Sequence, residues 1–369
     1  MSFFLECGDL SPLWSVATCR NLRSVESSLE LRRQAAADKS GQVSALQRDT
    51  LVSESEIMKH PILFLVIAVV FLTACQKATK QSPAVDPAVH RSEIQKWQND
   101  RLASLTKDDG WLTLVGLFWL KEGENKFGSD AKNAVVLPRD KAPGVAGSLW
   151  LEKARVRLIG RSDVGISVLD TAGEARNAGP LPLKDDNDEG GPTIVKLGSL
   201  LINVIKRGER IGVRVKDTES RTRREFKGLE YYPIDPKWRI EARFEPYQPA
   251  KAIPITNVLG MTDDEASPGA LAFEVDGKTY RIDPILEKGE TDLFVMIADQ
   301  TTGKETYGAG RYLYVSPPDA AGKVVIDFNK TYSPPCAFTN FATCPLPPQQ
   351  NHLPFRVDAG EKKYAGTVH

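Results

Sequence analysis

A long series of short apolar runs, beginning at Trp111, sets narrow limits on the architecture of this chain. Each run has the length of a β-strand, and Gly, Pro, Asn or Asp separates it from the next. The expected strands lie near residues 111–119, 134–137, 149–151, 154–159, 165–169, 194–197, 200–206, 211–216, 239–244, 271–275, 278–282, 292–298, 311–315 and 323–327. Asp276-Gly277, between two such runs, is typical of a tight hairpin turn. Because no long helical pattern interrupts the series, the sequence predicts a mainly β fold of antiparallel sandwich-like or barrel-like units.

A single amphipathic helix is expected ahead of the strands, over about residues 87–106. Asp86 suits the N-cap position, and Pro87 suits the first turn. Four apolar side chains fall on one face at helical spacing: Ile94, Trp97, Leu102 and Leu105. We place the helix with a first β unit in residues 89–232, and a second β unit in residues 233–369.

Residues 58–75 (MKHPILFLVIAVVFLTAC) resemble the signal of a bacterial lipoprotein. Lys59 and His60 make a short basic start, and residues 61–74 carry no charge. These fourteen residues are too few for a bilayer span, which takes about 20 residues. They end in Leu-Thr-Ala-Cys, which is similar to the lipobox, the cleavage motif of such proteins. The resemblance implies that the signal peptide 58–74 is removed and that the Cys75 thiol carries a diacylglyceryl group.

The lipid implies a location and a first partner, the membrane. Residues 75–88 are polar and contain Pro and Ser, so we read them as an extended tether. Gln76 follows the cysteine where Asp would favour the inner membrane, so we expect an outer-membrane protein of the cell envelope that faces the periplasm.

Residues 1–57 do not fit in front of such a signal, which works at an N-terminus. We interpret Met58 as the start and residues 1–57 as a translated upstream extension that is not native to the protein. The alternative is a cytoplasmic extension on a single-pass anchor.

The charge balance argues against a nucleic-acid binder. Lys and Arg total 48, as do Asp and Glu, so the formal net charge is zero. A protein that binds nucleic acid needs a basic face to displace counterions from the phosphates. The sequence shows no motif that indicates a cofactor.

The stretch from residue 323 to residue 361 holds many prolines, yet it is rich in Phe, Tyr, Leu and Cys. Prolines forbid ordinary strands or helices through residues 333–348, and the apolar content argues against a solvated linker. We expect a fixed loop that packs on the body, with residues 329–354 roofing a pocket.

Cys336 and Cys344 in this loop allow four readings. A disulfide would suit an oxidising periplasm, and a buried pair of free thiols is the next reading. A zinc site would recruit His352 and lacks a fourth ligand. A redox-active dithiol lacks the usual CxxC spacing.

Polar residues near the loop are the candidates for ligand binding or catalysis: Asp327, Asn329, Asn351 and Glu361. Paired carboxylates can do acid–base chemistry when burial raises one pKa, although such side chains also satisfy backbone groups in irregular loops. Arginines at strands or strand ends could converge on an anion: Arg214, Arg224, Arg243 and Arg311. Structural ion pairs, with Asp217 and Asp299 as partners, are the alternative.

Several long blocks resemble the domain of unknown function 1684 family. They include GWLTLVGLFWLKEGENKFGSD, RGERIGVRVKD, TTGKETYGAGRYL, DFNKTYSPPCAF and CPLPP, in this order. The resemblance covers about residues 90–361 and implies no particular chemistry.

The sequence is therefore compatible with three functions. The first is a lipid-anchored envelope protein that binds a small anionic or sugar ligand or serves as a scaffold. The second is a hydrolase of an anionic or sugar substrate that uses Asp327, Glu361 and Arg311. The third is a purely structural envelope protein.

Overall fold

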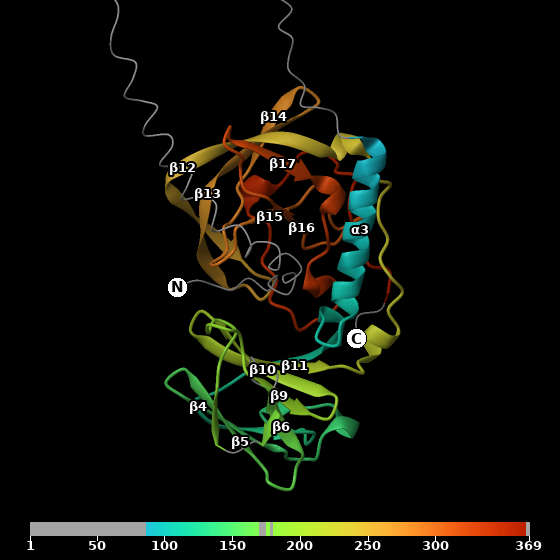
Figure 1. The fold of residues 1–369 in the computed structure, drawn as a ribbon. Coiled ribbons are helices and arrows are strands. Elements are labelled where there is room, and N and C mark those ends of the chain that lie inside the picture. The colour runs from blue at the N-terminus through green and yellow to red at the C-terminus, as the bar shows by residue number, and fades with distance from the viewer. Residues whose placement is uncertain (1–85, 170–174, 178–179, 367–369) are drawn as a thin grey trace, which may run out of the picture. The chain divides into compact units, whose positions relative to one another are not determined.

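The structure is a computed structural model that describes residues 86–169, 175–177 and 180–366 (Figure 1). Residues 1–57, the predicted signal 58–74, Cys75 and all but the last three residues of the predicted tether lie outside the described residues. The lipid on Cys75 therefore stays a prediction. In the described part of the chain, no helix is both long and apolar enough to cross a membrane.

The fold is mainly β and antiparallel, as the sequence predicts, and two sheets are built from the first eleven strands. One has the order β1-β11-β10-β9-β6-β7, and the other has the order β3-β2-β4-β5-β8, in which β2 and β3 are parallel. The strands are β1 (Leu114–Trp119), β2 (Gly123–Gly128), β3 (Val135–Val136), β4 (Gly147–Glu152), β5 (Arg155–Gly160), β6 (Ile166–Leu169), β7 (Ala175–Asn177), β8 (Leu181–Leu183), β9 (Ile194–Leu197), β10 (Leu200–Arg207) and β11 (Arg210–Asp217). Alternate side chains of both sheets, such as Leu149 and Val213, form one buried core.

The remaining strands form a second pair of antiparallel sheets, with the orders β14-β13-β12-β17 and β15-β16. The strands are β12 (Arg239–Thr256), β13 (Thr262–Val275), β14 (Lys278–Ile282), β15 (Leu293–Ile297), β16 (Arg311–Val315) and β17 (Lys323–Asp327). Phe273, Val295 and Ile326 belong to the core of this part. The hairpin at Asp276-Gly277 is confirmed: Val275 pairs with Lys278, and both turn residues have positive φ.

The predicted helix is confirmed as α3 (Pro87–Thr106), but its buried face differs from the expected one. Ile94 and Leu105 are buried, whereas Leu102 is 39% exposed. His90 and Arg101 lie buried on the same face instead. The helix therefore packs on the body through two polar side chains as well as apolar ones.

Short helical turns fill several connections. They are η2 (Trp111–Thr113), η3 (Arg139–Lys141), α4 (Arg221–Arg224), η4 (Pro236–Trp238), η5 (Phe328–Lys330), η6 (Pro335–Ala337) and η7 (Gln349–Asn351). The strand expected at 111–119 therefore begins only at Leu114, because η2 occupies its first three residues.

Residues 327–361, which we call the C-terminal segment, follow the last strand and pack onto the body as a fixed loop. Phe338, Cys344 and Val357 are fully buried in it. Phe338 and Cys344 share a core with Leu105 of α3 and Leu114 of β1. The segment is thus held by apolar contacts although prolines exclude regular structure.

Candidate functional site

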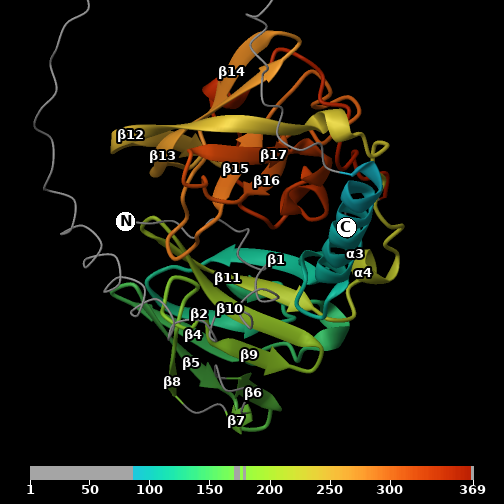
Figure 2. The ribbon, with the colours of Figure 1, turned by 45° about the horizontal axis from the view of Figure 1, so that its top comes forward.

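Several candidate residues of the sequence lie in or against the C-terminal segment, and α3 lies alongside this segment (Figure 1 and Figure 2). The first contact joins His90 of α3 to Asp327 at the end of β17, with 2.6 Å between Nε2 and Oδ2. Asp327 also caps η5, because its Oδ1 accepts the Asn329 backbone N–H at 3.1 Å. Asn329 then links to the backbone of Asp235 in both directions. Asp327 and Asn329 therefore fix the start of the segment.

The second contact joins Arg101 of α3 to Glu361 at the end of the segment, with 3.4 Å between Nε and Oε2. Arg101 also donates to the Ser333 carbonyl at 2.9 Å, and its guanidinium lies 4.7 Å from the centre of the Tyr332 ring. Burial raises the pKa of Glu361, and the charge of Arg101 opposes that rise. Two of the most buried charges in the described chain therefore depend on each other.

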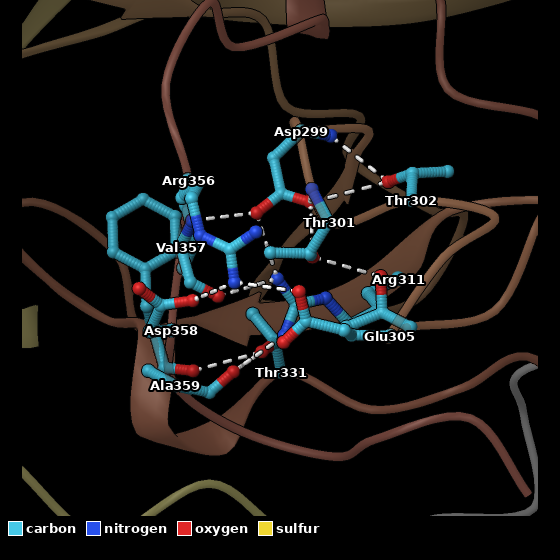
Figure 3. Close-up of polar contacts among 12 residues, drawn as sticks. Asp299, Thr301, Thr302, Glu305, Arg311, Thr331, Arg356, Val357, Asp358 and Ala359 are labelled. Carbon is cyan, nitrogen blue, oxygen red and sulfur yellow. Dashed lines mark hydrogen bonds and ion pairs between the residues drawn. The ribbon is translucent and has the colours of Figure 1, made fainter.

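Arg311 on β16 makes the most complete polar cluster (Figure 3). Its Nη2 donates to Asp299 at 3.1 Å and to the Val357 carbonyl at 3.0 Å, and its Nη1 donates to the Ala359 carbonyl. Asp299 in turn accepts the Val357 N–H at 2.6 Å. Arg311 and Asp299 are each 1% exposed at the side chain. Burial lowers the pKa of Arg311, and Asp299 opposes that shift. Asp299 is thus the partner of Arg311, as the sequence suggested. The cluster fixes the backbone of residues 357–359 by hydrogen bonds.

Asn351 is fully buried, and its side-chain amide is used entirely by the backbone. Its Oδ1 accepts the Asp283 N–H at 2.7 Å, and its Nδ2 donates to the carbonyls of Asp283 and Met296. This is the pattern of a residue that replaces missing backbone pairing in an irregular loop.

The predicted arginines do not converge on one anion site. Arg311 is consumed by its own cluster, and Arg243 is exposed and paired with Glu245. Arg224 is exposed on α4, and Arg214 is buried beneath Trp111, with 5.0 Å between its guanidinium and the ring centre. Asp217 lies within 3.9 Å of Lys141. The grouping expected from the sequence is therefore not observed.

Cys336 and Cys344 lie in contact, and no disulfide joins them in the structure. The backbone N–H of Cys336 donates to the Cys344 Sγ at 3.2 Å. A ring nitrogen of the exposed His352 instead lies 3.2 Å from the Pro347 carbonyl oxygen. Among the described residues, no three His, Cys, Asp or Glu side chains form a group that could hold a metal ion, so the three do not assemble the zinc site considered from the sequence.

Sequence reasoning missed two acidic residues, Glu287 and Glu265. Glu287 is 9% exposed and accepts the Tyr314 hydroxyl at 2.8 Å. Burial raises the pKa of Glu287 to about 7; the Tyr314 hydrogen bond opposes this shift, while Glu290 and Glu265 add to it. Burial, assisted by Asp263, likewise raises the pKa of Glu265 to about 7. Sequence signals do not mark these positions, because their burial depends on strand pairing that is remote in sequence.

His90 and Arg101 were also overlooked as partners of the segment. Their spacing gives a signal: together with Ile94 and Leu105 they recur every four or seven residues, as one helical face requires. This helical face is not recognised from hydrophobic periodicity because His90 and Arg101 are polar.

Residues 224–362 match the family model described as Protein of unknown function (DUF1684). The chain belongs to this family. The match spans the second pair of sheets and the C-terminal segment, whereas His90 and Arg101 precede it.

The chain is also similar to a solved structure that is one of several matching chains. It is the solution NMR structure of an uncharacterized protein from Haloarcula marismortui, with 30% sequence identity, and it covers 39% of this chain and 81% of that chain with a TM-score of 0.34. No curated protein matches the sequence.

Proposed function

We propose that this chain is a lipid-anchored protein of the cell envelope, and that its β-rich body is a rigid scaffold or binding module. The observation that supports the scaffold is that the candidate residues are engaged in buried contacts within the protein. Asp327, Glu361 and Arg311 are each buried in a separate pair, with His90, Arg101 and Asp299 as the respective partners. Removing one partner of such a buried pair leaves the other charge unpaired and strongly destabilises a fold, which is the behaviour expected of structural residues.

The lipid anchor is tested by metabolic labelling with a fatty acid. Expression with labelled palmitate is expected to mark the wild-type protein and a Cys336→Ser variant, which keeps the lipobox. Cys75→Ser is expected to lose the label and to leave the membrane fraction. Label that persists in Cys75→Ser would disprove the anchor.

The hydrolase alternative is disfavoured by the same three pairs. Asp327 and Glu361 contact opposite ends of α3, at His90 and Arg101, and Arg311 faces the backbone of residues 357–359. A hydrolase needs its acid and base to meet at one accessible bond. The scaffold proposal therefore expects that the protein has no hydrolytic activity that depends on Glu361. Any turnover of esters, phosphate esters or glycosides that is measured should persist in Glu361→Gln.

A specific observation favours a second candidate, the binding of a small neutral polyol such as a sugar. Among the described residues, Glu361 Oε1 and Tyr231 Oη are buried and have no hydrogen-bond partner. Tyr231 and Glu361 form a β-bridge, so both groups lie at one place beneath α3. An acceptor beside a hydroxyl suits a ligand hydroxyl.

A thermal-shift screen of residues 76–369 with sugars and small anions separates the candidates. A ligand at about one hundred times its Kd stabilises a protein by about 2.7 kcal/mol, which raises Tm by several degrees. A sugar-dependent rise that Tyr231→Phe removes favours the polyol site. If no sugar raises Tm, the scaffold is the one of these two candidates that remains.

A further inference from the structure

We infer that Cys336 and Cys344 form a redox-active dithiol, in which Cys336 attacks an external disulfide and Cys344 then closes the intramolecular bond. The inference starts from their contact. The Cys336 N–H donates to the Cys344 Sγ at 3.2 Å, and the two thiols are hydrogen-bonded to each other. Thiols in contact can exchange bonds without rearrangement of the backbone.

The backbone around both cysteines is held in place from outside the loop. The Tyr307 hydroxyl donates to the Cys336 carbonyl at 2.7 Å. The Cys344 carbonyl accepts the N–H of Val258, at the end of the β12–β13 hairpin, at 2.9 Å. Thr343, next to Cys344, accepts a hydrogen bond from Arg207 of β10 at 3.4 Å. The backbone that carries the two cysteines is therefore held in a fixed position.

The two thiols differ in exposure, which gives the reaction an order. Cys336 is partly exposed, whereas Cys344 is fully buried. The hydrogen bond from Cys344 lowers the pKa of the Cys336 thiol, against an opposing effect of burial. An accessible thiol with a favoured thiolate is the nucleophile of such a pair.

The reaction is a balanced thiol–disulfide exchange. The Cys336 thiolate attacks one sulfur of a disulfide RSSR, a Cys336–SR bond forms, and RS⁻ leaves. Cys344 then loses its proton, and its thiolate attacks the Cys336 Sγ and expels a second RS⁻. Both leaving thiolates take up protons, so one dithiol and one RSSR give one protein disulfide and two RSH. The protein is oxidised and the external disulfide is reduced.

The test uses the reduced full chain, glutathione disulfide as the oxidant, and mass spectrometry of peptides, which separates this pair from Cys7, Cys19 and Cys75. We expect a Cys336–Cys344 bond that excess reduced glutathione opens again. In Cys344→Ser, glutathione should accumulate on Cys336. In the matched Cys336→Ser variant, modification of Cys344 should be at least about tenfold slower.

Three results would overturn the inference. They are equal labelling of the two single variants, no bond in the wild type, or a bond that reduced glutathione cannot open. Iodoacetamide labelling of the unmutated protein does not depend on how variants fold, and it should modify Cys336 before Cys344.

Discussion

Glu287→Gln should make the stability of this protein markedly less dependent on pH. Glu287 is 9% exposed, and its neighbours Glu290 and Glu265 are acidic. Because burial and these charges penalise the ionised form, the folded protein holds the Glu287 proton up to a pH of about 7. Glutamine resembles the protonated form and still accepts the Tyr314 hydroxyl.

The size and sign follow from the two pKa values. The Glu287 pKa rises from 4.5 in the unfolded chain to about 7 in the folded protein, which corresponds to about 3 kcal/mol. A carboxyl with a raised folded pKa binds its proton more tightly in the folded state. Its stabilising contribution is therefore complete below about pH 4.5 and is lost as pH rises through about 7. The Gln variant should match the wild type at pH 4 and exceed it by about 3 kcal/mol at pH 8.

Urea unfolding, followed by tryptophan fluorescence between pH 4 and pH 8, measures this difference. Glu274→Gln is the matched control, because Glu274 is an exposed carboxyl on β13. The unfolding free energy of Glu274→Gln, plotted against pH, should run parallel to that of the wild type. Parallel curves for Glu287→Gln as well would refute the argument that burial keeps this carboxyl protonated.

Two further predictions compare matched pairs of substitutions by urea unfolding. On α3, Leu105→Ala should cost about 3 kcal/mol because Leu105 is 1% exposed, whereas Leu102→Ala should cost about 0.5 kcal/mol or less; equal losses would contradict the observed buried face. Gly360→Ala should cost about 2–4 kcal/mol, because Gly360 has positive φ and its new Cβ would strike Thr331. Gly277→Ala has similar φ but open space around the Cβ, so it should cost only about 1 kcal/mol.

The sequence allowed the fold class to be predicted, because local patterns determine it. The hairpin at Asp276-Gly277 and the bounds of α3 both rest on residues that are close in the chain. The long β12–β13 pair was only partly predicted. β12 continues past Pro246, where its pairing with β13 is interrupted and resumes at Lys251. Prolines end a strand pattern in sequence, but a bulge can carry the pairing past them.

The site was harder to predict than the fold. The candidates Asp327, Asn351 and Arg311 do lie in or against the C-terminal segment, as their positions suggested. Their partners could not be read from the sequence, because pairs such as His90 with Asp327 join residues 237 positions apart. Nor could the sequence show that each of these charges already has a buried partner.

A double-mutant cycle on Arg311 and Asp299 tests most directly whether these buried charges hold the fold. Arg311→Met and Asp299→Asn should each cost about 3–5 kcal/mol in unfolding free energy, because each leaves a buried partner unpaired. The double variant should recover about 1–3 kcal/mol of the summed loss. Single variants that unfold like the wild type, with additive effects, would contradict the account.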